Sequence, residues 1–127
     1  MPKTVTVVVT YDIPWERFPE WADAIVDLVD TVKAQVPRLV SFNVYIAEDS
    51  SEAASIWIHP DTESLEQHLE VAASRIDVVA QMVEPTRVDI YGRPSEKVLE
   101  QFRRISEQSN GFPIVIKRRY YGSLGPG

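Results

Sequence analysis

The stretch Ser55-Ile-Trp-Ile-His-Pro-Asp-Thr-Glu-Ser-Leu-Glu-Gln-His-Leu69 joins two kinds of secondary structure. Its first five residues contain β-branched and aromatic side chains, which predicts a strand over residues 53–59. The strand ends at a Pro-Asp turn, and Asp61 is suited to N-cap the helix that follows. Both histidines of the chain, His59 and His68, lie within this strand–turn–helix unit. Because histidine is the usual proton-handling side chain near neutral pH, this unit is the first candidate for an active site.

Periodic patterns on either side of this unit predict the remaining elements. Strands are expected over residues 4–11, 38–47 and 84–91, a helix over residues 19–36, and a helix capped by Ser95. Residues 112–121 predict a last strand or an arm. The apolar stripe of the central helix comprises Leu65, Leu69, Ala72, Ile76 and Val79. A break near Ser74 or Asp77 would divide that helix in two.

The order β-α-β-β-α-β predicts an α+β fold of the ferredoxin-like type, with an antiparallel sheet and both helices on one face. A C-terminal α-β extension follows this core. The whole chain, residues 1–127, is expected to form a single domain, with the core at 4–92, the extension at 93–121 and a tail at 122–127.

The second face of this sheet is expected to carry mixed polar and aromatic side chains. We assign Ile56 and Ile58 to the helix-covered face, which places the neighbouring strand residues on the other one. That face then comprises Thr6, Thr10, Asn43, Tyr45, Trp57, His59, Arg87 and Tyr91. Aromatic side chains at this density favour burial against a second copy, giving a homodimer built as a dimeric α/β barrel. The assignment also places His59 and His68 on opposite sides of the sheet, in separate pockets.

Composition narrows the partners and the compartment. The 127 residues include no cysteine, which excludes disulfides and thiolate chemistry and fits a cytoplasmic protein. The net charge of −6 disfavours nucleic acids and anionic membranes as partners. The N-terminal residues lack a signal-peptide pattern, and no apolar run is long enough to span a bilayer. The basic and aromatic segment Lys117–Tyr121 is expected to be a solvated arm or a dimer-wrapping strand.

The candidate site residues each have a functional and a structural interpretation. His68 could act as a general base, kept neutral by burial, or could simply pack between helix and sheet. Trp57, Tyr45 and Tyr91 could line a pocket for a planar substrate or fill the dimer barrel. His59 could orient a substrate, share a proton with His68, or only end its strand. Arg87 could hold an anion or pair with Asp89, and Asn43 could polarise a carbonyl or bind the backbone.

Metal and nucleotide cofactors are not expected. A metal site from His59, Asp61, Glu63 and His68 lacks the spacing of known histidine motifs. The sequence also lacks a P-loop and a GxGxxG fingerprint.

The segment from His59 to His68, with Val36-Pro37-Arg38 before an alternating strand, resembles the antibiotic biosynthesis monooxygenase-like proteins of the dimeric α/β-barrel superfamily. The resemblance covers residues 4–91. It implies oxidation of quinols or polycyclic phenols by molecular oxygen without a cofactor, with His68 matching the helix histidine. The strand-end position, usually Trp in the family, is His59 here, with Trp57 two residues earlier. Val78 stands where haem-degrading relatives have the iron ligand, which disfavours haem.

The resemblance therefore implies a cofactor-free monooxygenase acting on a small aromatic, quinol-like or polyketide substrate, with His68 as the catalytic residue. Two alternatives remain open: a non-catalytic small-molecule-binding or regulatory dimer, and an isomerase or cyclase on the same fold.

Overall fold

The computed structural model describes residues 3–122, apart from the side chains of residues 74–80. Ile76, Val78 and Val79 of the sequence analysis, and the tail from 123 onward, therefore lie outside the described part. The elements are β1 (Val5–Asp12), a 3₁₀ turn (Trp15–Arg17), α1 (Phe18–Gln35), β2 (Ser41–Ile46), β3 (Glu52–His59), α2 (Thr62–Ala80), β4 (Glu84–Tyr91), α3 (Glu96–Gln108) and β5 (Ile114–Lys117). Among the described helices, none is long and apolar enough to cross a membrane.

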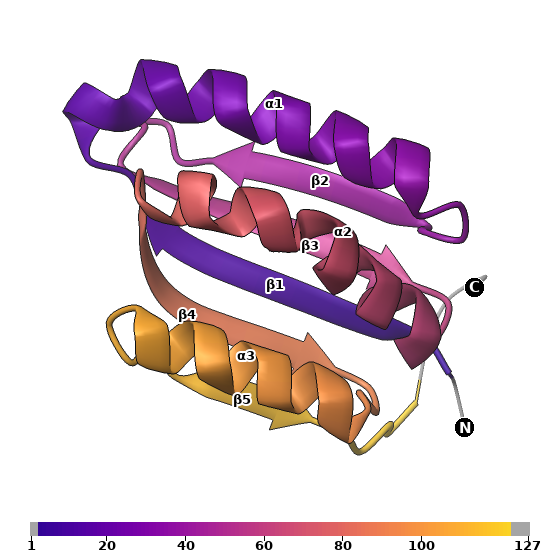
Figure 1. Ribbon diagram of the computed structural model, residues 1–127. Coiled ribbons are helices and arrows are strands. Elements are labelled where there is room, and N and C mark those ends of the chain that lie inside the picture. The colour runs from indigo at the N-terminus through magenta and orange to yellow at the C-terminus, as the bar shows by residue number, and fades with distance from the viewer. Residues whose placement is uncertain (1–2, 123–127) are drawn as a thin grey trace.

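One five-stranded sheet in the order β2-β3-β1-β4-β5 carries all three helices on one face (Figure 1). The first four strands pair antiparallel, in the order expected of a ferredoxin-like fold. The extension adds α3 to the helical layer and β5 to the sheet edge, where β5 runs parallel to β4. The predicted α+β fold class is confirmed.

Helix ends follow the capping residues of the sequence. Asp61 accepts a hydrogen bond from the backbone N–H of Ser64 at 2.9 Å and so caps α2. Ser95 caps α3 by accepting from the N–H of Val98 at 3.3 Å. The expected break of α2 near Ser74 or Asp77 is wrong, because the helix continues to Ala80. Residues 62–80 contain neither glycine nor proline, so nothing in them forces a break.

The buried side chains that the structure describes form two hydrophobic clusters. The first gathers around α1 and β2, with Trp21 and Phe42 among its buried members. The second gathers around α3, β4 and the start of α2, with Leu65 and Phe102 among its members. Val9 and Trp57 pack against both clusters, so they lie at the seam between them.

The orientation predicted for β3 is wrong. In the register of the sheet, His59 pairs with Val5 and Trp57 with Val7, and both valines are fully buried under the helices. Paired residues on neighbouring antiparallel strands share a face, so Trp57 and His59 point toward the helices. Ile56 and Ile58 occupy the opposite face instead.

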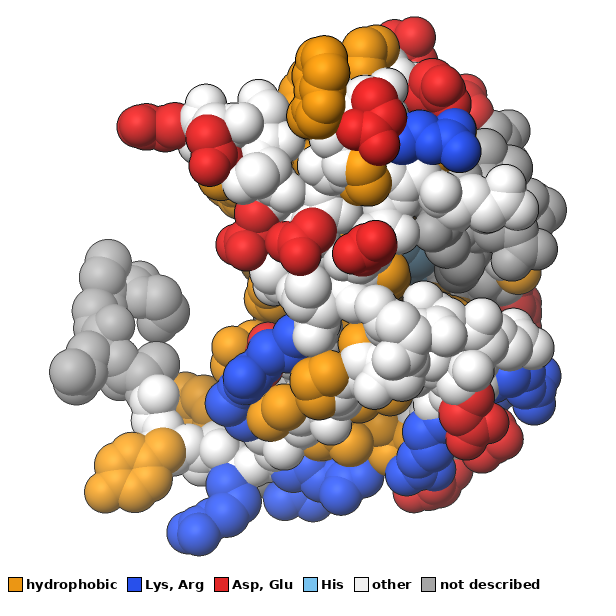
Figure 2. Space-filling view, turned by 90° about the vertical axis from the view of Figure 1, so that its left-hand side faces the viewer, with side chains coloured by type: hydrophobic (Ala, Val, Ile, Leu, Met, Phe, Trp, Pro, Cys, Tyr) orange, Lys and Arg blue, Asp and Glu red, His pale blue; other side chains and the backbone are white. Residues whose placement is uncertain are grey.

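No helix or strand of the described residues covers the face of the sheet away from the helices, and this face is hollowed on the left side of Figure 2. Strands β1 to β4 place Val8, Ile56, Ile58, Asn43, Tyr45, Arg87, Asp89 and Tyr91 on it. Tyr45 is 62% exposed and Tyr91 41% exposed in the single chain. The uncovered face is therefore more apolar than predicted, since two isoleucines replace Trp57 and His59 on it.

Candidate functional site

The two histidines form a direct hydrogen-bonded pair. His59 Nε2 lies 3.0 Å from His68 Nδ1, and His59 Nδ1 lies 2.7 Å from the hydroxyl oxygen of Ser64. Both imidazoles are 0% exposed and Ser64 is 2% exposed. The expectation that the histidines occupy separate pockets is therefore wrong, and its cause is the inverted face of β3.

The strand–turn–helix unit brings these three residues together. His59 is the last residue of β3 and points toward the helices, while α2 begins three residues later and runs back over the sheet. Ser64 and His68 lie four residues apart, on one face of α2. Asp61 holds the start of the helix in place through the Ser64 N–H and forms an ion pair with Arg38.

Burial keeps both imidazoles neutral. It lowers the pKa of His59 to about 4, against a partly opposing effect of the Asp61 carboxylate. Burial, reinforced by His59, lowers the pKa of His68 to about 3. At neutral pH each ring therefore has one protonated and one bare nitrogen, and the proton between the rings fixes the tautomers of both.

The far nitrogen of His68 has no partner. Its Nε2 atom is buried and makes no hydrogen bond within the described part of the chain. The ring centroid of His68 lies 4.2 Å from that of Trp57 and 5.4 Å from that of Phe42, which stacks on it. A buried polar atom without a partner is uncommon in native proteins and calls for an explanation, such as a catalytic role. The Nε1 atom of the adjacent Trp57 is also buried without a partner among the described residues.

A cavity of about 110 Å³, partly open to the surface, lies beside this aromatic layer, where residues of the two core clusters meet. Trp57, Phe42 and Leu69 form part of its wall, and its other lining residues are almost all apolar. Tyr11 and Ser55 also line the cavity, but their hydroxyl oxygens lie 3.0 Å from each other and contribute no polar surface to it. Burial raises the pKa of the Tyr11 hydroxyl, so it stays protonated at neutral pH. Tyr11, Ser55 and Ser64 could not be recognised as site residues in the sequence, because hydroxyl residues on strands and helix starts have no distinctive pattern.

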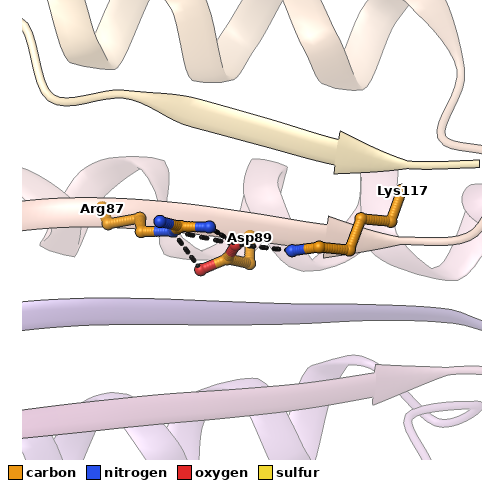
Figure 3. A network of polar contacts seen from close by, with 3 residues as sticks. All are labelled: Arg87, Asp89 and Lys117. Carbon is orange, nitrogen blue, oxygen red and sulfur yellow. Dashed lines mark hydrogen bonds and ion pairs between the residues drawn. The ribbon is translucent and has the colours of Figure 1, made fainter.

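The remaining predicted site residues lie on the uncovered sheet face, on the other side of the sheet from His68. Asn43 and Tyr45 are exposed on β2. On β4, Arg87 makes a bidentate ion pair with Asp89 at 2.8–3.0 Å, and Lys117 of β5 reaches the same carboxylate at 3.0 Å (Figure 3). These two cations lower the pKa of Asp89. The structural interpretation of Arg87, pairing with Asp89, is the one observed.

A second, polar pocket of about 580 Å³ lies outside the start of α2. Ser64 lines it together with Arg38, Asp61, Arg93, Lys3 and others. Ser64 therefore separates an open polar pocket from the buried histidine pair. The described residues include no group of three or more possible metal-ligating side chains.

Comparison with known proteins was made on sequence and on structure. Neither a protein-family model nor a curated protein sequence matches the chain. Among solved structures, MupZ from Pseudomonas fluorescens is similar over 98% of this chain and 96% of its own, with a TM-score of 0.74 and 10% identity. SnoaB, a cofactor-independent oxygenase from Streptomyces nogalater, is similar over 73% of this chain and 95% of its own, at a TM-score of 0.62 and 11% identity.

A Caulobacter crescentus protein, provisionally assigned to the antibiotic biosynthesis monooxygenases, has a TM-score of 0.63 and 14% identity over 70% of this chain and 88% of its own. The fold is that of the antibiotic biosynthesis monooxygenases. The resemblance noted in the sequence is thereby supported at the level of fold. MupZ matches nearly the whole chain, so the antibiotic biosynthesis monooxygenase fold with an added α3 and β5 has a solved counterpart.

Proposed function

We propose that the protein is a small-molecule enzyme that removes a proton from a phenolic or quinol-like substrate, with His68 as the general base. The observation that carries the proposal is the unpartnered, buried Nε2 of His68, held next to the aromatic wall of an apolar cavity. A neutral imidazole is the correct protonation state for a base. The antibiotic biosynthesis monooxygenase fold supports oxygen as the second substrate and a reaction without a cofactor.

The cavity indicates the size of the substrate. A cavity of about 150 Å³ holds one benzene ring in a well-studied protein core. The volume of about 110 Å³ is smaller than this, so the cavity as it stands suits at most one ring or a short acyl segment. Because Trp57 and Phe42 separate His68 from the cavity, a substrate of any size would require one of these side chains to move before it could reach Nε2.

Oxygen uptake with hydroquinone and with 1,4-dihydroxynaphthalene tests this function. The wild-type protein should consume oxygen and form the quinone, and His68→Gln should lose at least 100-fold in rate, the usual scale of a general base, while keeping its fold. Circular dichroism and the melting temperature verify folding. Full activity of the variant would rule out His68 as the base.

The second candidate is a non-catalytic ligand-binding protein. It is favoured by one observation, that Trp57 and Phe42 stand between His68 and the cavity in this conformation. In that case phenol or hydroquinone would raise the melting temperature, yet no product would form. Turnover that continues without oxygen would instead identify an isomerase or cyclase.

We also propose a homodimer in which two copies bury their uncovered sheet faces against each other. The exposed tyrosines and the outward isoleucines of this face support the proposal. In such a dimer Asn43, Tyr45, Arg87 and Tyr91 would contact the partner instead of the substrate.

A further inference from the structure

Ser64, His59 and His68 form an unbroken line of hydrogen-bonding atoms between two different environments. At one end, Ser64 lines the open polar pocket at the start of α2. At the other end, the unpartnered Nε2 of His68 lies in the interior, where Trp57 and Phe42 separate it from the apolar cavity. The two links of 2.7 Å and 3.0 Å are both within hydrogen-bond distance. Each residue in the line can donate a proton from one side and accept one on the other.

We infer that Ser64 and His59 relay protons between His68 and the solvent of the polar pocket. This inference rests on the proposed role of His68 as a base. His59 and Ser64 act only through His68 and do not touch the substrate.

Once all the proton transfers of the relay are complete, neither histidine carries a net charge. In the starting tautomers, His68 Nδ1–H donates to His59 Nε2, and His59 Nδ1–H donates to the hydroxyl oxygen of Ser64. The O–H bond of the substrate breaks and a new N–H bond forms at His68 Nε2. His68 then passes its Nδ1 proton to His59, and His59 passes its own Nδ1 proton to Ser64. Ser64 releases its hydroxyl proton to water in the pocket.

The products of these transfers are a substrate anion and a hydrated proton, with both histidines neutral in their opposite tautomers. The reverse sequence restores the starting tautomers. It returns a proton to the substrate or, in an oxygenase, to the reduced oxygen.

A relay solves a difficulty that His68 alone would face. Its imidazolium has a pKa of about 3, whereas a phenol titrates near 10, so direct transfer is unfavourable by about 10⁷-fold. If the proton of the same phenol is instead released to water at pH 7, ionisation of the phenol is unfavourable by only about 10³-fold. The buried pair can therefore move a proton that neither ring could keep.

The first experiment is ¹⁵N NMR of the unliganded protein with labelled histidines, which does not depend on activity. A scalar coupling between His59 Nε2 and His68 Nδ1 is expected across the shared proton. Ser64→Ala should shift the tautomer populations of both rings, including the more distant His68. Ser106→Ala is the matched control, because it removes another buried hydroxyl, which donates to the Phe112 carbonyl at 2.7 Å in the second core cluster. A missing coupling, or His68 shifts that do not respond to Ser64→Ala, would overturn the relay.

The second experiment uses p-nitrophenol as a single-ring probe, because its phenolate is coloured. At pH 5.5, where free p-nitrophenol is almost entirely un-ionised, a pH indicator in weakly buffered solution should report about one proton released for each phenolate formed on the wild-type protein and on Ser106→Ala. Ser64→Ala should form less phenolate, and the little it forms should release few protons. Equal proton release from Ser64→Ala would contradict the relay while leaving His68 as the base. No phenolate on the wild-type protein would count against the proposed function itself, and the NMR coupling would still decide whether the hydrogen-bonded line exists.

Discussion

His59 and His68 should make the protein sensitive to mild acid. In the folded state burial lowers their pKa values to about 4 and about 3, whereas the unfolded chain titrates near 6.5. Below pH 6.5 the unfolded state therefore binds more protons than the folded state, and stability falls as the pH falls toward 4. Each histidine can remove up to about 1.4 kcal/mol per pH unit in this window.

Urea unfolding at pH 7, 6 and 5 measures this dependence, and His68→Gln is its control. The variant keeps every carboxylate, so the difference between the two proteins isolates the histidine. In the variant, the free energy of unfolding should fall less steeply with decreasing pH than in the wild-type protein. The difference should be about 1.4 kcal/mol per pH unit, which corresponds to one proton bound on unfolding. Equal slopes would mean that His68 is not buried in its neutral form.

The position of these residues could be predicted only in part. The sequence places both histidines in one strand–turn–helix unit, and this is where the structure has them. It does not reveal which face of β3 points inward, because Ile56 and Ile58 alternate with Trp57 and His59 and both sets look suitable for burial. When both faces of a strand are apolar, alternation alone cannot fix its orientation. The hydrogen bond between the histidines depends on that single choice of face.

At the scale of elements, the connection from β4 to α3 depends on Gly92. Its φ of +117° lies in a region that other residues rarely adopt, and an added Cβ would lie 2.6 Å from the carbonyl oxygen of Thr4. Gly111 has a φ of +73° but open space around it. Gly111→Ala should therefore cost about 1 kcal/mol from backbone strain alone, and Gly92→Ala should cost at least about 2 kcal/mol more.

Urea unfolding of the two variants tests this difference. The pair is matched, because both replace a glycine of positive φ by alanine and only one meets a backbone atom. Similar losses in both variants would show that the chain near Thr4 can move aside.

Element ends were more predictable than element orientation. Asp61 and Ser95 were both expected to cap helices, and each accepts a hydrogen bond from a backbone N–H three residues later. Capping depends on a local side chain and its near neighbours, so the sequence contains the whole interaction. Ser95 also donates to Glu66 of α2 at 2.6 Å, a contact between elements that no local pattern reveals.

At the scale of the whole molecule, the order of strands and helices was sufficient to predict the ferredoxin-like sheet. The division of the core into two clusters with a cavity between them was not predictable. That division depends on how α1, α2 and α3 share one face of the sheet, and helix packing is decided by side-chain shape over long sequence separations. The cavity therefore became visible only in the structure.

The uncovered sheet face leads to the last prediction, which concerns assembly. Ile58 pairs across the sheet with Thr6 and Ser41 toward one end of this face, whereas Val26 is 59% exposed on the opposite, helical side. If two copies pack sheet to sheet, Ile58→Lys places two charges inside the interface, where desolvation is costly. Val26→Lys adds the same charge to a surface that stays in water.

Light scattering during gel filtration should give a dimer for the wild-type protein and Val26→Lys, and a folded monomer for Ile58→Lys. A wild-type monomer at about 100 µM would refute the proposed dimer, since sheet-to-sheet interfaces of the usual size of about 1,600 Å² form well below that concentration. A dimer that survives Ile58→Lys would place the interface on another surface. The position of Ile56 and Ile58 on the uncovered face would then have no explanation.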